Sequence, residues 1–190
     1  MSEAVQADRL ALSYGLAAVL LWSTVATAFK LALRELDVLQ LLALAIVFST
    51  VALWMILRLQ GRLYLLRQYA RETPLYFLVM GLVNPVDYYL VLLRAYELLP
   101  AQQAQAINYT WAITLALLAV PLLGHRLTRR DLLAVIMGSG GVLVIATRGR
   151  VLALEFTSRE GVVYALVSTL IWALYWLAAT RTRRDPVACL

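Results

Sequence analysis

Residues 38–57, VLQLLALAIVFSTVALWMIL, form a run of twenty residues without a charged side chain. A helix of about 20 residues can span the hydrocarbon core of a bilayer, which is about 30 Å thick. Five further apolar runs lie in the chain, and the charged residues gather between them. This pattern predicts an all-α integral membrane protein with about six transmembrane helices. The predicted helices cover residues 10–33, 38–57, 74–93, 101–123, 132–147 and 160–179.

The composition of the whole chain agrees with the membrane class. Of its 190 residues, 63% are hydrophobic, and the mean hydropathy is +0.78. A soluble fold needs more polar residues than this to cover its core. The runs also lack the alternating pattern of a transmembrane β-barrel. The net charge of +6 belongs to loops rather than to a soluble basic domain, so we expect the lipid bilayer as a partner and no nucleic acid.

Arginine and lysine residues divide unevenly between the two sides that this helix order predicts. Residues 1–9 and the segments after the second, fourth and sixth helices hold eleven of them, and the opposite side holds six. The positive-inside rule therefore predicts that both termini are cytoplasmic. Because Glu3 and Asp8 do not fit the basic start of a signal peptide, we expect the first apolar run to be retained as a helix.

The first and sixth predicted helices share aromatic residues at one common offset. At an offset of 150 residues, Tyr14 falls on Tyr164 and Trp22 falls on Trp172. Transporters are commonly built from two related halves, although two apolar helices can also match by chance.

A genuine repeat has consequences for the domain organisation. Residues 10–150 would then form one five-helix unit, and residues 160–190 would begin a second one. The second unit would be inverted, because its first helix follows an odd number of helices. Two such units need about 300 residues. We therefore expect either a truncated protein whose second half is missing or a six-helix protein that pairs with a second copy as a homodimer.

Polar and aromatic side chains within the apolar runs are candidates for a substrate site. A carboxylate is costly in lipid, so Asp87 either serves proton coupling or cation contact in a cavity or lies at the outer interface beside Arg94. Spacings of three and four put Gln105 and Asn108 on a polar stripe, which suits a hydrophilic path or hydrogen bonds between helices. Deep aromatic residues suit stacking and cation–π contact with small metabolites. The candidate cavity residues are Trp22, Asn84, Asp87, Tyr88, Gln105, Asn108, Trp111 and Trp172.

Two further features have a functional and a structural interpretation. Lys30 is the only lysine and lies near the outward end of the first helix, where it either meets an anionic substrate group or extends to the interface. Ala134 and Gly138 form a small-xxx-small pair in the fifth helix. Such a pair is typical of close helix packing.

The sequence contains no recognisable catalytic constellation. Ser139 lacks the leading glycine of a Gly-x-Ser-Gly motif, and the only histidine, His125, lies in the loop before that helix. There is no HExxH motif, no catalytic carboxylate pair and no phosphate-binding glycine loop. Cys189 is the only cysteine, which excludes a disulfide framework and a cysteine-based metal site. We therefore expect no enzyme activity, no metal and no cofactor.

Two stretches resemble EamA-type members of the drug/metabolite transporter superfamily. The segment Leu21-Trp22-Ser23-Thr24, followed by Phe29-Lys30, is similar to that family's opening pattern of Trp-Gly/Ser and then Lys. Residues 101–128 resemble its fourth helix and following loop, and the element Asn108-Tyr109-Thr110-Trp111 is similar to the amino-acid exporter branch. One departure is His125, which stands where the family usually has Glu.

The resemblance implies a fold and a function. It implies ten helices in two inverted five-helix units around a central cavity, located in the bacterial inner membrane. It also implies export of amino acids or similar small-molecule substrates by alternating access. Because four of the ten helices are absent from this sequence, the alternative is a truncated, non-transporting membrane protein or an assembly partner.

Overall fold

The computed structural model describes residues 3–124, 126–152 and 156–181, with side chains from residue 11 onward in the first helix. The predictions for His125 and Cys189 lie outside the described residues. Helices and no strands form the described part, which confirms the predicted all-α fold. The helices are α1 (Glu3–Ala32), α2 (Val38–Leu59), α3 (Tyr64–Glu72), α4 (Pro74–Gly81), η1 (Leu82–Asp87), α5 (Tyr88–Leu98), α6 (Ala101–Asn108), α7 (Trp111–Leu123), α8 (Arg129–Ala146) and α9 (Arg159–Thr180).

Five segments within the described ranges are long and apolar enough to cross a membrane. They are Ala11–Ala32, Val38–Leu59, Pro74–Leu98, Ala101–Leu123 and Arg159–Thr180. The remaining predicted helix is present as α8, whose 18 residues begin with Arg129, Arg130 and Asp131. Its uncharged part is therefore shorter than the run of about 20 residues that spans a bilayer directly.

Two of the spanning segments are interrupted near their middle. In the segment formed by α4, η1 and α5, Asn84 has the non-helical dihedral angles φ −146° and ψ 114°. The segment formed by α6 and α7 breaks at Tyr109 and Thr110. There the Thr110 backbone N–H donates to the Ile107 carbonyl over 3.0 Å, which is the tighter i→i−3 pattern of a 3₁₀ turn. Pro85 indicates the first break in the sequence. The second break cannot be predicted from the length of the apolar run.

Helix α3 is an element that the apolar runs did not predict. Its sequence, YLLRQYARE, is too polar and too short to appear as a membrane span. It follows α2 after four residues and is separated from α4 by Thr73 alone. The Tyr69 ring stacks on the Phe77 ring of α4 with 6.0 Å between centroids, which fixes α3 against the start of that helix.

Helix α9 lies at the centre of the bundle and packs against α5, α6 and α7. Ala165, Ser168 and Ala173 of α9 have no exposed surface. Small side chains let helix backbones approach closely in membranes. The approach is tightest at Gly161, where an added Cβ would lie 2.7 Å from the Leu99 Cγ atom at the end of α5.

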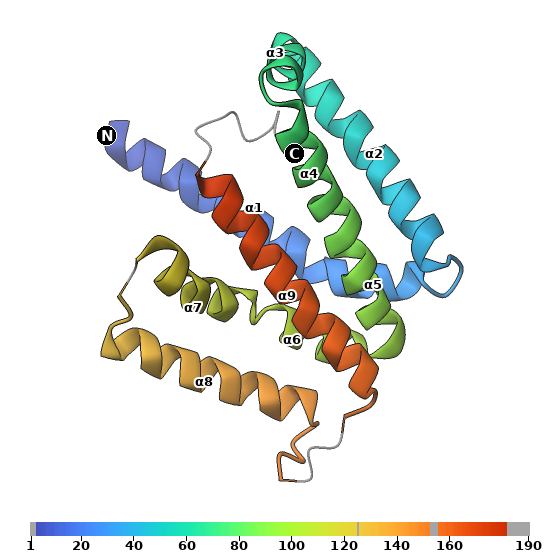
Figure 1. The fold of residues 1–190 in the computed structure, drawn as a ribbon, viewed down its shortest axis with the longest axis vertical. Coiled ribbons are helices and arrows are strands. Elements are labelled where there is room, and N and C mark those ends of the chain that lie inside the picture. The colour runs from blue at the N-terminus through green and yellow to red at the C-terminus, as the bar shows by residue number, and fades with distance from the viewer. Residues whose placement is uncertain (1–2, 125, 153–155, 182–190) are drawn as a thin grey trace.

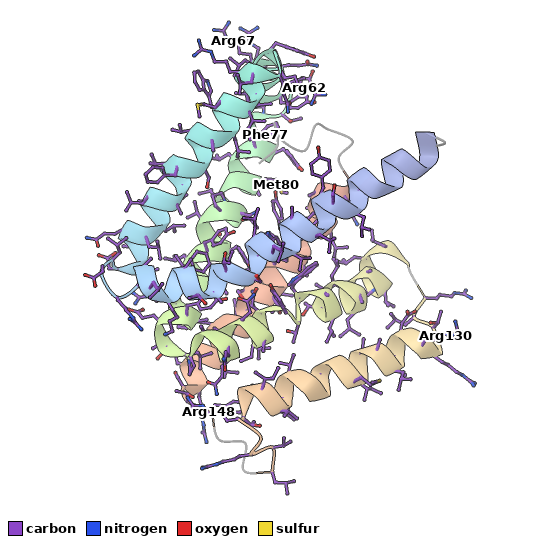
Figure 2. All side chains as sticks on the ribbon, turned by 180° about the vertical axis from the view of Figure 1, so that it is seen from behind. Arg62, Arg67, Phe77, Met80, Arg130 and Arg148 are labelled. Atoms are coloured by element: carbon purple, nitrogen blue, oxygen red, sulfur yellow. The ribbon has the colours of Figure 1, made fainter. Side chains whose placement is uncertain are left out.

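Helix α1 differs from α9 in being peripheral. None of its residues from Ala11 to Ala32 is buried. Figure 1 shows that α1 and α9 run in opposite directions, so that the start of α1 and the end of α9 lie toward the same side as α3. Figure 2 shows Arg62 and Arg67 beyond the end of α2, and Arg130 and Arg148 at opposite ends of α8.

Hydrogen bonds fasten the helix ends on both sides of the bundle. On one side, the Arg181 guanidinium donates to the Leu122 carbonyl of α7 over 3.2 Å. On the other side, the buried Gln103 amide donates to the Ala146 carbonyl of α8 over 3.0 Å. The Gln103 side-chain oxygen also accepts from the Thr157 hydroxyl over 2.9 Å. The first bond ties the end of α9 to α7, and the other two tie α6 to α8 and to the approach to α9.

The close contact at Gly161 leads to a stability prediction. Replacing Gly161→Ala places a methyl group against Leu99, and overpacking of this kind costs about 1–3 kcal/mol. We expect a clearly lower midpoint of thermal unfolding in detergent, measured by tryptophan fluorescence. The matched control is Gly140→Ala, because an added Cβ there meets nothing within 4 Å. Equal midpoints for the two variants would contradict the observed packing of α9 on α5.

Candidate substrate cavity

A cavity of about 90 Å³ lies among α1, α5, α6, α7 and α9. The spacing of four along α5 and of three and four along α1 brings aromatic residues of both helices to its wall. Six of the eight candidate residues predicted from the sequence line it, although their binding role stays a prediction. The lining residues are Trp22, Val25, Phe29, Tyr88, Tyr89, Leu92, Tyr96, Gln105, Asn108, Tyr109, Trp111 and Trp172.

Trp172 is the centre of the aromatic part of the cavity. Its ring centroid lies 4.5 Å from that of Tyr88, with the planes tilted by 32°. The Trp111 ring meets Trp172 edge-on at 6.4 Å. Such offset and edge-to-face pairs are favourable arrangements of aromatic rings. Three helices, α5, α7 and α9, therefore meet at one aromatic cluster.

A second aromatic wall comes from α1 and α5. The Phe29 ring packs against Tyr96 at 5.5 Å and against Tyr89 at 6.1 Å. The Tyr96 hydroxyl in turn donates a hydrogen bond to the Gln105 side-chain oxygen. None of the described residues that line the cavity carries a charge. The wall thus presents aromatic faces, hydroxyls and two amides to any molecule inside.

Asn108 is the buried polar anchor of the cavity. Only 6% of its surface is exposed. Its Nδ2 donates to the Ser168 Oγ of α9 over 3.0 Å, and its Oδ1 accepts from the Tyr88 hydroxyl over 3.4 Å. The Ser168 hydroxyl donates onward to the Ala165 carbonyl over 2.7 Å. This network joins α5, α6 and α9 at the inner wall. Asn108 therefore both lines the cavity and forms hydrogen bonds between helices.

Asn84 and Asp87 are not among the residues that line this cavity, whereas Tyr88 is. Asp87 is exposed, and Asn84 is half-buried. On a regular helix, Asn84 would share a face with Tyr88, which lies four positions later. Because η1 is a wider π-type turn, the two side chains do not align in this way. Asp87 precedes Tyr88 directly and so points about 100° away from it. Arg94, the alternative neighbour of Asp87, pairs instead with Glu97 at 2.6 Å.

The other sequence candidates take structural positions. Lys30 is half-buried at the end of α1 and does not line the cavity, although its neighbour Phe29 does. Gly138 of α8 faces α7, since an added Cβ would lie 3.2 Å from the Ile113 Cδ1 atom. This contact agrees with close packing through the small residues of that helix. Ser139 is exposed on the same helix.

Several lining residues were not among the sequence candidates. Leu92 and Tyr96 continue the stripe of Tyr88 at spacings of four, and Val25 and Phe29 continue that of Trp22 at three and four. Extending each stripe from its first aromatic residue would have found them. Phe29 and Leu92 carry no polar group, so a search for polar or unusual side chains passed over them.

A wide groove opens beside the cavity, between α1 and the α6–α7 segment. Its volume is about 830 Å³, and its wall consists mainly of small and apolar side chains. Trp22, Gln105, Tyr109 and Trp111 belong to both the cavity and the groove. The cavity is therefore the inner end of a larger recess that is open along α1.

The Asn108 network leads to a second prediction. Replacing Asn108→Leu removes the bridge between α6 and α9. Hydrogen bonds between membrane helices contribute about 0.6 kcal/mol on average and up to about 1.7 kcal/mol. We expect a loss within this range in a chemical unfolding titration, and a smaller added loss when Ser168→Ala is combined with it. The control is Gln102→Leu on the exposed side of α6. Full additivity of the Asn108 and Ser168 substitutions would contradict the bond.

Comparison with known proteins identifies the family. Residues 9–147 match the model of the EamA-like transporter family. No curated protein and no solved structure matches the chain significantly. The matched range covers most of the chain. It contains α1 from residue 9 onward and the whole of the helices from α2 to α8. It also contains every lining residue of the cavity except Trp172. The protein is thus a multi-pass membrane protein of transporter type, and it belongs to the EamA-like transporter family.

Proposed function

We propose that this protein exports amino acids or similar small metabolites across the bacterial inner membrane by alternating access, with both termini in the cytoplasm. The aromatic and amide-lined cavity is the substrate site. The observation that carries the proposal is that Trp22 and Trp172, which correspond at the offset of 150 residues, lie on the wall of the same cavity. Substrate sites of transporters built from repeats lie between the repeats, near the bilayer midplane.

The chemistry of the wall supports a small zwitterionic or neutral substrate. The faces of Trp111 and Trp172 attract an ammonium group by cation–π interaction and stack on apolar or planar side chains. The side-chain amides of Gln105 and Asn108 can bind a carboxylate through N–H groups and an ammonium through their oxygens. Because none of the lining residues in the described part of the chain carries a charge, these residues favour neither a strong anion nor a strong cation.

The size of the cavity supports a site that is completed by further protein. Ligand pockets commonly measure about 300–1,000 Å³, whereas the cavity here measures about 90 Å³. The adjoining groove adds about 830 Å³ and is open. A second unit that covers this groove would enclose a substrate between itself and Trp22, which is the arrangement that alternating access requires.

The burial of α1 and α9 supports the division into two inverted units, residues 10–150 and the unit that α9 begins. Ala165, Ser168 and Ala173 are fully buried against the first unit. Their counterparts at the offset of 150 are Gly15, Ala18 and Ser23, and all three are exposed on α1. Both helices therefore carry a face of small residues, and this face is buried on α9 and exposed on α1. A second five-helix unit would cover the α1 face as the first unit covers α9.

A binding measurement tests the cavity as the substrate site. Replacing Trp172→Ala removes one stacked ring, which contributes about 0.5–1.5 kcal/mol. We expect the Kd for radiolabelled phenylalanine or leucine to rise roughly two- to twelvefold, measured by scintillation proximity with the purified chain. The control is Trp54→Ala, because Trp54 is exposed on α2. Equal effects of the two variants, or no binding by the wild type, would count against this site.

Flux through proteoliposomes separates transport from the alternative of a non-transporting assembly partner. The wild type is expected to exchange labelled for unlabelled amino acid across the vesicle membrane, and the Trp172→Ala variant is expected to do so more slowly. Binding without exchange would indicate that the 190-residue chain is a partner or an incomplete carrier.

A further inference from the structure

Helix α3 is held at the membrane boundary by the helices on either side of it. The spanning segment α2 ends at Leu59, and the spanning segment that starts with α4 begins at Pro74. Only residues 60–73 lie between them, and α3 occupies nine of these residues. A link this short keeps α3 at the level where lipid headgroups lie, since both neighbouring helices must leave and enter the same face of the bilayer.

The two faces of α3 differ in chemistry. Leu65 and Tyr69 are half-buried, and Tyr69 stacks on Phe77 of α4. Arg67 and Arg71 are exposed and lie four residues apart, so they share one face. Each of them is two positions from Tyr69, which places their face roughly opposite the packed one. Helix α3 thus has the two-sided pattern of a helix that lies in a membrane interface.

The positive charge is concentrated at this boundary. Residues 58–72 contain four arginines and one glutamate, a net charge of +3. The connection between α1 and α2, residues 33–37, contains one arginine, one glutamate and one aspartate, a net charge of −1. In addition, the Arg58 guanidinium lies 5.3 Å from the Trp54 ring centroid. Tryptophan with arginine at the end of a spanning helix is typical of the headgroup level.

We propose that α3 binds the headgroup of an anionic glycerophospholipid, whose phosphodiester lies between Arg67 and Arg71. Planar guanidinium groups bind phosphate oxygens through paired N–H donors, and basic segments next to spanning helices attract anionic lipids. The lipid tails would lie along exposed apolar side chains in the first turns of α4, where Leu75 is 71% exposed and Leu78 is 61% exposed. This apolar surface selects a lipid over free phosphate.

Native mass spectrometry tests the proposal with the purified full chain in detergent. The protein is mixed with equal amounts of phosphatidylglycerol and phosphatidylcholine that carry the same acyl chains. The numbers of each lipid that stay bound to the protein are then compared. We expect a preference for phosphatidylglycerol of at least about fivefold, the effect of one arginine near an anionic lipid surface. The double variant Arg67→Gln/Arg71→Gln should lose it.

Matched variants make the outcome specific to α3. The double variant Arg129→Gln/Arg130→Gln removes the same charge at the start of α8 and should retain the preference. The pair Arg67→Lys/Arg71→Lys keeps the charge without the planar donors and should retain part of it. If the glutamine pair does not fold, Arg71→Gln alone should reduce the preference by about half on a logarithmic scale. An undiminished preference after loss of both arginines, no preference in the wild type, or competition by 10-fold excess inorganic phosphate would overturn the proposal.

Discussion

The hydrogen bond from the Asn108 amide to the Ser168 hydroxyl, 3.0 Å long, holds the centre of this bundle together. Two polar side chains at bilayer depth are costly unless they find partners. Their bond, the bond from Tyr88 and the bond from Ser168 to the Ala165 carbonyl satisfy them. Within the described residues, every buried side-chain nitrogen or oxygen has a partner. Helices α5, α6 and α9 are therefore tied at one level, and the aromatic cavity forms beside this tie.

The wall of the cavity is incomplete on the side of α1. Helix α9 is drawn into the bundle by its small residues and by Ser168, and it brings Trp172 to the cavity. Helix α1 carries a corresponding face of small residues and Trp22, but none of its membrane-spanning residues is buried. A cavity of about 90 Å³ consequently opens into a groove of about 830 Å³ along α1. In the proposed two-unit architecture, a second unit would close this recess beside α1.

Much of the fold could be predicted because a bilayer restricts what a chain can do. A spanning segment must satisfy its backbone internally and must be about 20 residues long, so uncharged runs such as residues 38–57 predict both the element and its ends. Helix α3 was missed because its nine residues form neither a long run nor an apolar one. The break at Tyr109 and Thr110 was missed because the apolar run continues through it and neither proline nor glycine lies at that point.

By itself the sequence determined the all-α membrane class, the approximate positions of the long apolar helices and six residues that share one cavity, although the third predicted helix extends to Leu98 rather than to residue 93. These properties follow from run length and from spacings along a single helix, which are local. Only the tertiary structure decided that Asp87 turns away from the cavity while Tyr88 faces it, that Phe29 and Tyr96 join the wall, and that α9 is central while α1 is exposed. Those outcomes depend on how helices rotate and pack against one another, and residue spacing within one helix does not specify this.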